Sequence, residues 1–380
     1  MNLNLLAPIN SLSYGYVSYN IIKSLIGQGH EISLFPLGGI DTTDITNPND
    51  IRMLQNAINN SSNEKFSFNN PSIRIFHQNQ LAQHVSNKLR IGFPIFELDE
   101  FSPIEKIHLS GQDALFVCSK WAKSIIEKNG IKTPTYVVPL GVDNTIFDKN
   151  KRVERKKDEP YRFLNIGKWE YRKGHDFLIE AFNNAFTDKD NVELVLCPHN
   201  FFINDEQTKE WHDLYMASPL KDKILFIRRL ERQEDIAYLI NSCDCGIFPS
   251  RAEGWNLGLL ECMSMGLDTI ATNYSAHTEF CNQDNCHLLE IKESESAFDG
   301  VFFKNGIGNW AQLDDKVMEQ CVAAMRKSYT NRKVNEGGIK TGQIYTWNNT
   351  ATTLINSIRS TYGQDVLISD TKNQSGPIQQ

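Results

Sequence analysis

Short apolar runs alternate with helix-like stretches along almost the whole chain, and this alternation limits the fold more than any other feature. The runs at 2–8, 31–37 and 114–119 have the length and composition of buried strands. Amphipathic helical patterns follow at 13–30 and 120–130. Strands that alternate with helices predict a parallel sheet covered by helices on both faces, so the fold class is α/β.

The alternation is interrupted once, by the charged and nearly apolar-free stretch at 148–160, and resumes with a strand pattern at 161–169. The stretch has two interpretations, a patch for a membrane surface or a phosphate and a solvated linker between domains, and we favour the linker. A chain of 380 residues suits two domains. We predict two doubly wound domains, a final helix that packs back towards the first domain, and a polar tail, with the boundaries 1–150, 151–345, 346–365 and 366–380.

Composition excludes several classes of protein. The net charge of −7 argues against a nucleic-acid partner, whose binding domain usually carries a basic face. No apolar run reaches the roughly 18 residues that a membrane-spanning helix needs. The N-terminus has neither a charged leader region nor a cleavage site. We therefore expect a cytoplasmic protein.

The eight cysteines are scattered. Cys281 and Cys286 lie near His277 and His287, which makes a zinc site conceivable. No paired C-x2-C spacing supports it, so reduced thiols are the favoured interpretation and we predict no metal.

Two loops of the second half follow predicted strands, where parallel sheets bind their ligands. The first is GKWEYRKG at 167–174, in which Lys168 and Lys173 could hold a diphosphate between them. Lysines are also common in ordinary loops of this type, so the pattern by itself decides nothing.

The second loop opens the segment RAEGWNLGLLECMSMG at 251–266, and a helix is expected to begin near Asn256. The start of that helix would offer free N–H groups to an anion. Glu261, one turn into the helix, and Glu253, in the turn before it, could each accept hydrogen bonds from sugar hydroxyls. The alternative is two solvated acids, but apolar residues flank Glu261, and a carboxylate there needs a partner.

The N-terminal turn at 13–18 contains Gly15, which would allow a close backbone approach before a helix. It is a single glycine, so the G-x-G-x-x-G dinucleotide fingerprint is absent.

These segments together resemble the retaining glycosyltransferases of family 4, which have the GT-B fold. The family signature is similar to PSRAEGWNLGLLECMSMG at 249–266 nearly position by position, and the upstream GKWEYRKGHDFLIEAF also fits. VVPLGVDNTIF at 137–147 resembles the element between the domains, and NYSAHTEF at 273–280 fits the segment after the next strand. The similarity covers nearly all of 114–330. It implies two Rossmann-like domains that face each other across a cleft.

The resemblance also implies roles for single residues. Glu261 would bind the donor ribose, Glu253 the hydroxyls of the donor sugar, and Lys168 and Lys173 the diphosphate. Gly15 would let the N-terminal loop close over the diphosphate. Arg229 or Leu230, which follow another strand, would lie against the base. The backbone around the helix start would contact sugar and phosphate, through Gly254, Trp255, Asn256, Leu257 and Gly258.

Two positions depart from the family pattern. Lys168 stands where family members commonly have arginine, so charge is kept while bidentate geometry is lost. The family often has a histidine after the strand that ends in GFPIFELDEF, where this chain offers Glu97 and Asp99. We predict Glu97 as the acceptor-side residue, and Glu253, Lys173 and Glu97 as the catalytic set.

The implied reaction moves a sugar from a nucleotide-diphosphate donor to an acceptor hydroxyl, with retention and with neither metal nor other cofactor. The acceptor class would be a glycan, a lipid-linked sugar or a polysaccharide precursor, which leaves peripheral contact with the cytoplasmic membrane face open. Two alternatives stay open as well. One is an epimerase or phosphorylase with the same architecture, and the other is a non-catalytic protein that binds sugar nucleotides or glycans.

Overall fold

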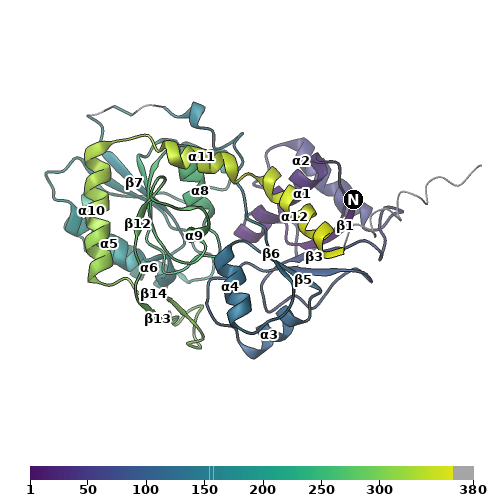
Figure 1. Cartoon of the computed structure of the whole chain (residues 1–380). Helices are drawn as coiled ribbons and strands as arrows, with labels where there is room; N and C mark the ends of the chain where they lie inside the picture. Colours follow the sequence, from purple (N-terminus) through teal and green to yellow (C-terminus); the bar gives the residue numbers. More distant parts are fainter. Residues whose placement is uncertain (154, 157, 363–380) are drawn as a thin grey trace, which may run out of the picture.

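The chain is built around two parallel six-stranded sheets, seen side by side in Figure 1. The structure is a computed structural model that describes residues 1–153, 155–156 and 158–362. Each sheet is flanked by helices, so the expectation of two doubly wound α/β domains is confirmed. The predicted polar tail at 366–380 lies outside the described residues.

The N-terminal sheet has the strand order β2-β1-β3-β4-β5-β6, and every neighbouring pair is parallel. Its elements in chain order are β1 Asn2–Ala7, α1 Ser13–Gly27, β2 Glu31–Pro36, α2 Pro48–Asn60, β3 Ser72–Ile75, β4 Arg90–Phe93, α3 Pro103–Ser110, β5 Ala114–Val117, α4 Lys120–Lys128 and β6 Thr135–Val137.

The C-terminal sheet has the order β12-β11-β10-β7-β8-β9 and is also parallel. The elements of the second half of the chain are β7 Tyr161–Ile166, α5 His175–Ala185, β8 Val192–Cys197, α6 Asp205–Met216, β9 Ile224–Phe226, α7 Gln233–Asn241, β10 Cys245–Phe248, α8 Leu257–Ser264, β11 Asp268–Thr272, α9 His277–Phe280, β12 His287–Leu289, β13 Ser294–Ser296, β14 Asn309–Ala311, α10 Asp315–Asn331, α11 Glu336–Ile344 and α12 Trp347–Tyr362, with short 3-10 turns at Lys149–Lys151, Tyr171–Lys173 and Lys221–Lys223. Strands β13 and β14 form a separate two-stranded antiparallel sheet.

The strand order of the C-terminal sheet decides where its loops meet. From β7 the chain runs outwards through β8 and β9, and it then returns to place β10 on the other side of β7. The loops that follow β7 and β10 therefore leave the sheet next to each other, at its switch point. In open α/β sheets this is the position where ligands bind.

The last helix crosses from one domain to the other. In Figure 1, α12 lies beside α1 of the N-terminal domain, although the preceding α11 belongs to the C-terminal domain. The Nε2 of Gln28 donates to the backbone oxygen of Asn348 at 2.8 Å, and the hydroxyl of Thr350 donates to the backbone oxygen of Pro139 at 2.8 Å. The end of the described chain is thus tied to the first domain.

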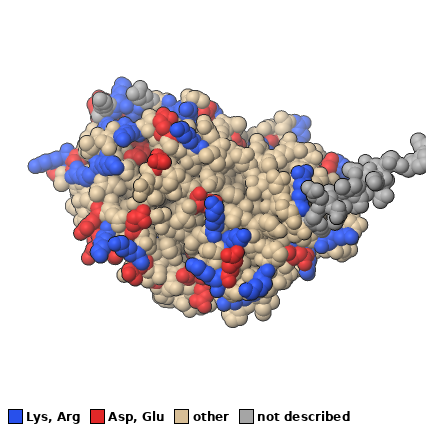
Figure 2. Space-filling view, in the orientation of Figure 1, with Lys and Arg blue, Asp and Glu red and all other residues tan. Residues whose placement is uncertain are grey.

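The charge of the surface and the composition of the helices are relevant to binding partners and membranes. Figure 2 shows acidic and basic side chains interspersed on one face of the molecule. As far as residues 1–362 are described, every helix is too short or too polar to cross a membrane.

Candidate functional site

The side chain of Glu253 lies at the switch point, where the loop after β10 meets the loop after β7. One of its carboxylate oxygens accepts from the Ser250 hydroxyl at 2.7 Å and from Lys173 Nζ at 2.7 Å. The other accepts from Lys173 Nζ at 2.9 Å and from Arg172 Nη1 at 3.1 Å. Only 4% of Glu253 is exposed. Four hydrogen bonds from three residues occupy the carboxylate, so its first task is to hold two cations in place.

Arg172 joins this site to its surroundings, and the sequence analysis did not identify it. Its Nη1 also donates to the backbone oxygen of Ala252 at 2.7 Å, and its Nη2 donates to Glu170 at 2.7 Å. Glu97 of the N-terminal domain lies 3.9 Å from the same Nη2. The only signal for it was its place between two other charged positions in the loop at 167–174.

The charges of the site stabilise one another. Burial by itself would raise the pKa of Glu253, but Lys173 and Arg172 outweigh burial and lower it to about 2. The pKa of Glu170 is lowered in the same way, because Arg172 and Lys168 outweigh the effect of burial. Both carboxylates are therefore ionised at neutral pH.

The two predicted lysines of the loop after β7 differ in their surroundings. Lys173 is held by Glu253 and only 16% of its side chain is exposed. The Nζ of Lys168 lies 3.1 Å from Glu170 and 5.2 Å from the centre of the Phe202 ring, and 40% of its side chain is exposed. Lys168 is thus the more exposed of the two lysines and the one more accessible to an incoming anion, although its partner Glu170 is buried.

Helix α8 begins where the sequence predicted. Asn256 caps it with a left-handed backbone (φ 83°), and its side-chain oxygen accepts from the N–H of Leu259 at 3.2 Å. The N–H groups of Leu257 and Gly258 have no hydrogen-bond partner among the described residues. A helix start with free N–H groups is an anion site in many folds.

Glu261 is buried one turn further along α8, with 5% of its surface exposed. No described residue forms a hydrogen bond or an ion pair with its carboxylate, and burial raises its pKa to about 8. The solvated alternative for Glu261 is therefore wrong. A buried carboxyl group without a protein partner costs stability, which is typical of a group kept for a ligand.

Trp255 and Gly254 pack in opposite directions. The Trp255 ring is buried against Phe280 and Tyr345, with ring centres 4.9 and 5.7 Å away, so only its backbone is available to a ligand. Gly254 faces the N-terminal domain, where a Cβ atom would lie 2.6 Å from the Ile95 side chain.

Because of that contact, Gly254→Ala should keep the two domains from closing fully. We expect a fall in turnover of tenfold or more, while the free energy of unfolding changes by only about 1 kcal/mol. Activity measurements combined with small-angle scattering check this, and Gly39→Ala serves as the control because a Cβ at Gly39 has nothing within 4 Å. Full activity in Gly254→Ala would contradict a role for this contact.

The predicted turn around Gly15 is wrong in detail. Residues 13–18 already belong to α1, and the actual turn precedes them. A Cβ at Gly15 would lie 2.0 Å from the backbone oxygen of Asn10. The glycine is therefore needed so that the loop containing Asn10 can pack against α1. The expectation that Gly15 lets this loop close over a diphosphate stays a prediction.

Arg229 and Leu230, the two residues after β9 that were predicted to lie against the base, have different surroundings. The side chain of Leu230 packs against the core cluster that runs between the domains. The guanidinium of Arg229 donates to the Ser11 hydroxyl at 2.6 Å and lies 4.3 Å from the centre of the Phe201 ring. Arg229 therefore ties the loop after β9 to the loop after β1.

On the N-terminal side the two acids have different partners. Asp99 accepts from the backbone N–H of Asn309 at 2.6 Å, which binds it to the start of β14. Glu97 keeps 31% of its side chain exposed beside Arg172. Of the two, Glu97 is the one with an accessible carboxylate at the site.

Metal-ligand types do not gather at the switch point. In the ranges that the structure describes, no three His, Cys, Asp or Glu side chains are grouped closely enough to hold a metal ion. All eight cysteines are free thiols, and all but Cys197 are buried.

Comparison with known proteins finds a family match in the second half of the chain. Residues 146–319 match the family described as glycosyl transferases group 1. The matched segment contains β7, β10 and α8, and therefore Glu253 and Glu261.

One curated relative of the chain is the uncharacterized glycosyltransferase YqgM of Bacillus subtilis (strain 168). It is 24% identical over 185 residues, and the match covers 49% of each chain, so this chain matches about half of that relative's length.

Two solved structures show the fold. Sucrose-phosphate synthase from Thermosynechococcus elongatus is 14% identical and has a TM-score of 0.67, over 95% of this chain and 99% of the other. Anabaena Alr3699/HepE in complex with UDP-glucose is 14% identical and has a TM-score of 0.64, over 95% of this chain and 100% of the other. The chain has the GT-B fold, as the sequence resemblance predicted.

Proposed function

We propose that the protein transfers a sugar from a nucleotide-diphosphate donor to an acceptor hydroxyl. The observation that carries the proposal is the junction of the loops after β7 and β10. There an accessible cation, free helix N–H groups and a buried carboxyl without a protein partner lie within one loop pair and the helix that follows. These are the groups that a diphosphate and a ribose require.

The diphosphate would lie between Lys168 and the start of α8. The ammonium group supplies a full positive charge, and the N–H groups of Leu257 and Gly258 add hydrogen bonds aligned with the helix dipole. When the bond from sugar to phosphate breaks, negative charge grows on the leaving diphosphate. Preorganised donors at this place stabilise that charge most in the transition state.

The ribose would be held by Glu261. Vicinal hydroxyls donate two hydrogen bonds to a carboxylate, and such bonds favour its ionised form. The raised pKa of Glu261 reflects the absence of any such donor in the free protein. Ligand binding would supply the partner that the protein itself withholds.

Glu253 is assigned to positioning and electrostatics rather than to proton transfer. A carboxyl group with a pKa of about 2 has no proton to give at neutral pH, and four hydrogen bonds from three residues already occupy it. Its contact with the donor sugar stays a prediction. We therefore propose a retaining reaction in which the leaving phosphate accepts the proton of the attacking hydroxyl, with Glu97 on the acceptor side.

We propose further that the reaction needs no metal, because Lys168 and the start of α8 can offset charge on the diphosphate. The acceptor would be a glycan, a lipid-linked sugar or a polysaccharide precursor. UDP is the first nucleotide to test, since the structurally similar protein Alr3699/HepE was crystallised with UDP-glucose.

Thermal unfolding against UDP, GDP, ADP and their sugar conjugates, with and without EDTA, tests the donor site. A nucleotide at a hundredfold excess over its Kd should stabilise the protein by about 2.7 kcal/mol, whether or not EDTA is present. Lys168→Ala should weaken binding roughly tenfold through the loss of one charge-assisted hydrogen bond.

Lys88→Ala, at an exposed lysine elsewhere, is the matched control and should bind normally. The absence of a shift with every nucleotide would reject the donor site. Binding without transfer or donor hydrolysis would instead favour a non-catalytic sugar-nucleotide binder.

A further inference from the structure

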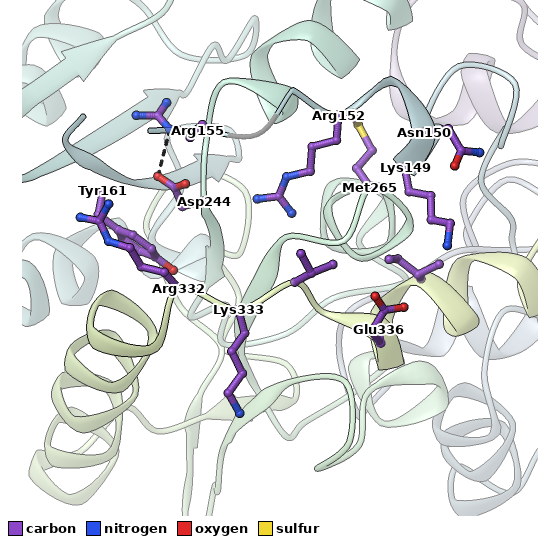
Figure 3. A pocket seen from close by; sticks show the side chains of 12 residues that line it. Lys149, Asn150, Arg152, Arg155, Tyr161, Asp244, Met265, Arg332, Lys333 and Glu336 are labelled. Atoms are coloured by element: carbon purple, nitrogen blue, oxygen red, sulfur yellow. Dashed lines mark ion pairs between the residues drawn. The ribbon is translucent and has the colours of Figure 1, made fainter. Parts of the chain in front are cut away.

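A cavity of about 500 Å³ opens on the C-terminal domain between the linker and the segment that joins α10 to α11 (Figure 3). Four residues of its lining, Lys149, Asn150, Arg152 and Arg155, come from the charged stretch at 148–160, which the proposed function does not use. Among the described lining residues, five side chains are cationic, namely Lys149, Arg152, Arg155, Arg332 and Lys333, and two are acidic, Asp244 and Glu336. Among these residues the cations outnumber the acids by three (5 − 2 = 3), in a chain whose net charge is −7.

One acid and one base of the lining neutralise each other. Arg155 Nε lies 3.3 Å from Asp244, whose carboxylate also accepts from the backbone N–H of Arg162 at 2.8 Å. Figure 3 shows this pair at one end of the opening, away from Lys149 and Lys333. Lys149 and Lys333 form no ion pair with a carboxylate of the described residues, and the second acid of the lining, Glu336, is exposed at the start of α11.

Arg152 is the half-buried cation of the cavity. Its Nη1 donates to the backbone oxygen of Gly266 at 2.6 Å, and no carboxylate of the described residues lies within ion-pair distance of it. In Figure 3 its guanidinium points into the opening. A partly desolvated guanidinium without an acidic partner is costly, and an anionic ligand would remove that cost.

Two further features give the cavity a defined shape. The guanidinium of Arg332 lies over the Tyr161 ring, 5.4 Å from its centre, so an aromatic face fixes its position. The apolar side chains of Met265 and Ile339 contribute to the same lining. The cations therefore stand around a walled space.

We propose that this cavity binds a phosphate group, either of a free phosphorylated molecule or of an anionic lipid. Clefts lined by charge of one sign concentrate ligands of the opposite sign, and lysine and arginine are the usual phosphate donors. The site is separate from the proposed donor site. Met265 and Gly266 follow the end of α8, whereas the diphosphate groups lie at its start, about 12 Å away along the helix.

Inorganic pyrophosphate is the first probe, measured by calorimetry. Because pyrophosphate also suits the proposed donor site, the titration is made on Lys168→Ala protein. Adding Lys149→Gln and Lys333→Gln, two exposed changes, should weaken the remaining binding by tenfold or more. Adding Lys88→Gln and Lys221→Gln instead, at two exposed lysines outside the cavity, should leave it unchanged.

Flotation with vesicles distinguishes the two sources of the phosphate group. Vesicles with phosphatidylglycerol should bind the protein in a Lys149- and Lys333-dependent manner if the natural ligand is a lipid, and phosphatidylcholine vesicles should not. Dependence on these lysines in either assay supports the proposal, and Arg152→Gln should reproduce it. Binding in neither assay, or binding equal in the cavity and control variants, would overturn it whether or not nucleotides bind.

Discussion

Glu253→Ala is expected to lower the free energy of unfolding by about 3–5 kcal/mol, because removing one member of a buried charged cluster leaves its partners uncompensated. Lys173 and Arg172 would face each other with like charges in a site from which water is largely excluded. The Ser250 hydroxyl would lose its acceptor too. Denaturant unfolding measures the loss.

Glu295→Ala is the control for this experiment. Glu295 also forms an ion pair with a buried arginine, Arg251, at 2.8 Å, but it is partly exposed and Asp176 shares the same guanidinium. Its removal should cost less than about 1 kcal/mol. An equal effect of the two variants would show that the buried cluster around Glu253 contributes no more to the free energy of unfolding than a partly exposed ion pair does.

The pH dependence of the free energy of unfolding tests the same ion pairs without removing the Glu253 side chain. The pKa of Glu253 falls from 4.5 to about 2 on folding, so its contribution is fully present above pH 4.5 and is lost as the pH falls towards 2. Glu253→Gln should remove that part of the acid sensitivity. If the variant and the wild type lose stability equally between pH 4.5 and 2, the ion pairs are not what lowers the pKa.

The sequence predicted the parts of this molecule that local pattern controls. Apolar runs such as 2–8 and 161–169 became strands, and α8 began at the cap Asn256 as expected. Helices α6 and α10 were not singled out, because their polar faces hide a weak apolar stripe. The hairpin of β13 and β14 was missed because its strands have only three residues each.

The candidate site was predicted as a set of residues but not as a network. Glu253, Lys173 and Glu261 were all named, yet nothing in the sequence says that Lys173 and Glu253 meet. That contact depends on the strand order, which places β10 beside β7. Arg172 was missed for the same reason, since an arginine in a polar loop looks solvated until the fold buries it.

Glu261→Gln is expected to stabilise the free protein at high pH. Burial raises the pKa of Glu261 from 4.5 to about 8, so folding favours the protonated form. The stability is then greatest below pH 4.5 and declines as the pH rises towards 8, by up to about 5 kcal/mol in all. Glutamine carries no charge, so the variant should match the wild type at pH 4 and unfold at a clearly higher temperature at pH 9.

The same change should weaken nucleotide binding, because ribose hydroxyls donate to a carboxylate and would stabilise its ionised form. Nucleotide binding to the wild type at pH 7 should therefore release close to one proton, seen by calorimetry in buffers of different ionisation enthalpy. Glu261→Gln should bind at least tenfold more weakly and release none. Glu295→Gln, at a carboxylate outside α8, should change neither quantity.

A Glu261→Gln variant that is more stable at pH 9 but binds nucleotide as the wild type does would leave Glu261 a buried acid with no ligand. A variant that loses stability at pH 9 would mean that the carboxylate already has a partner in the free protein.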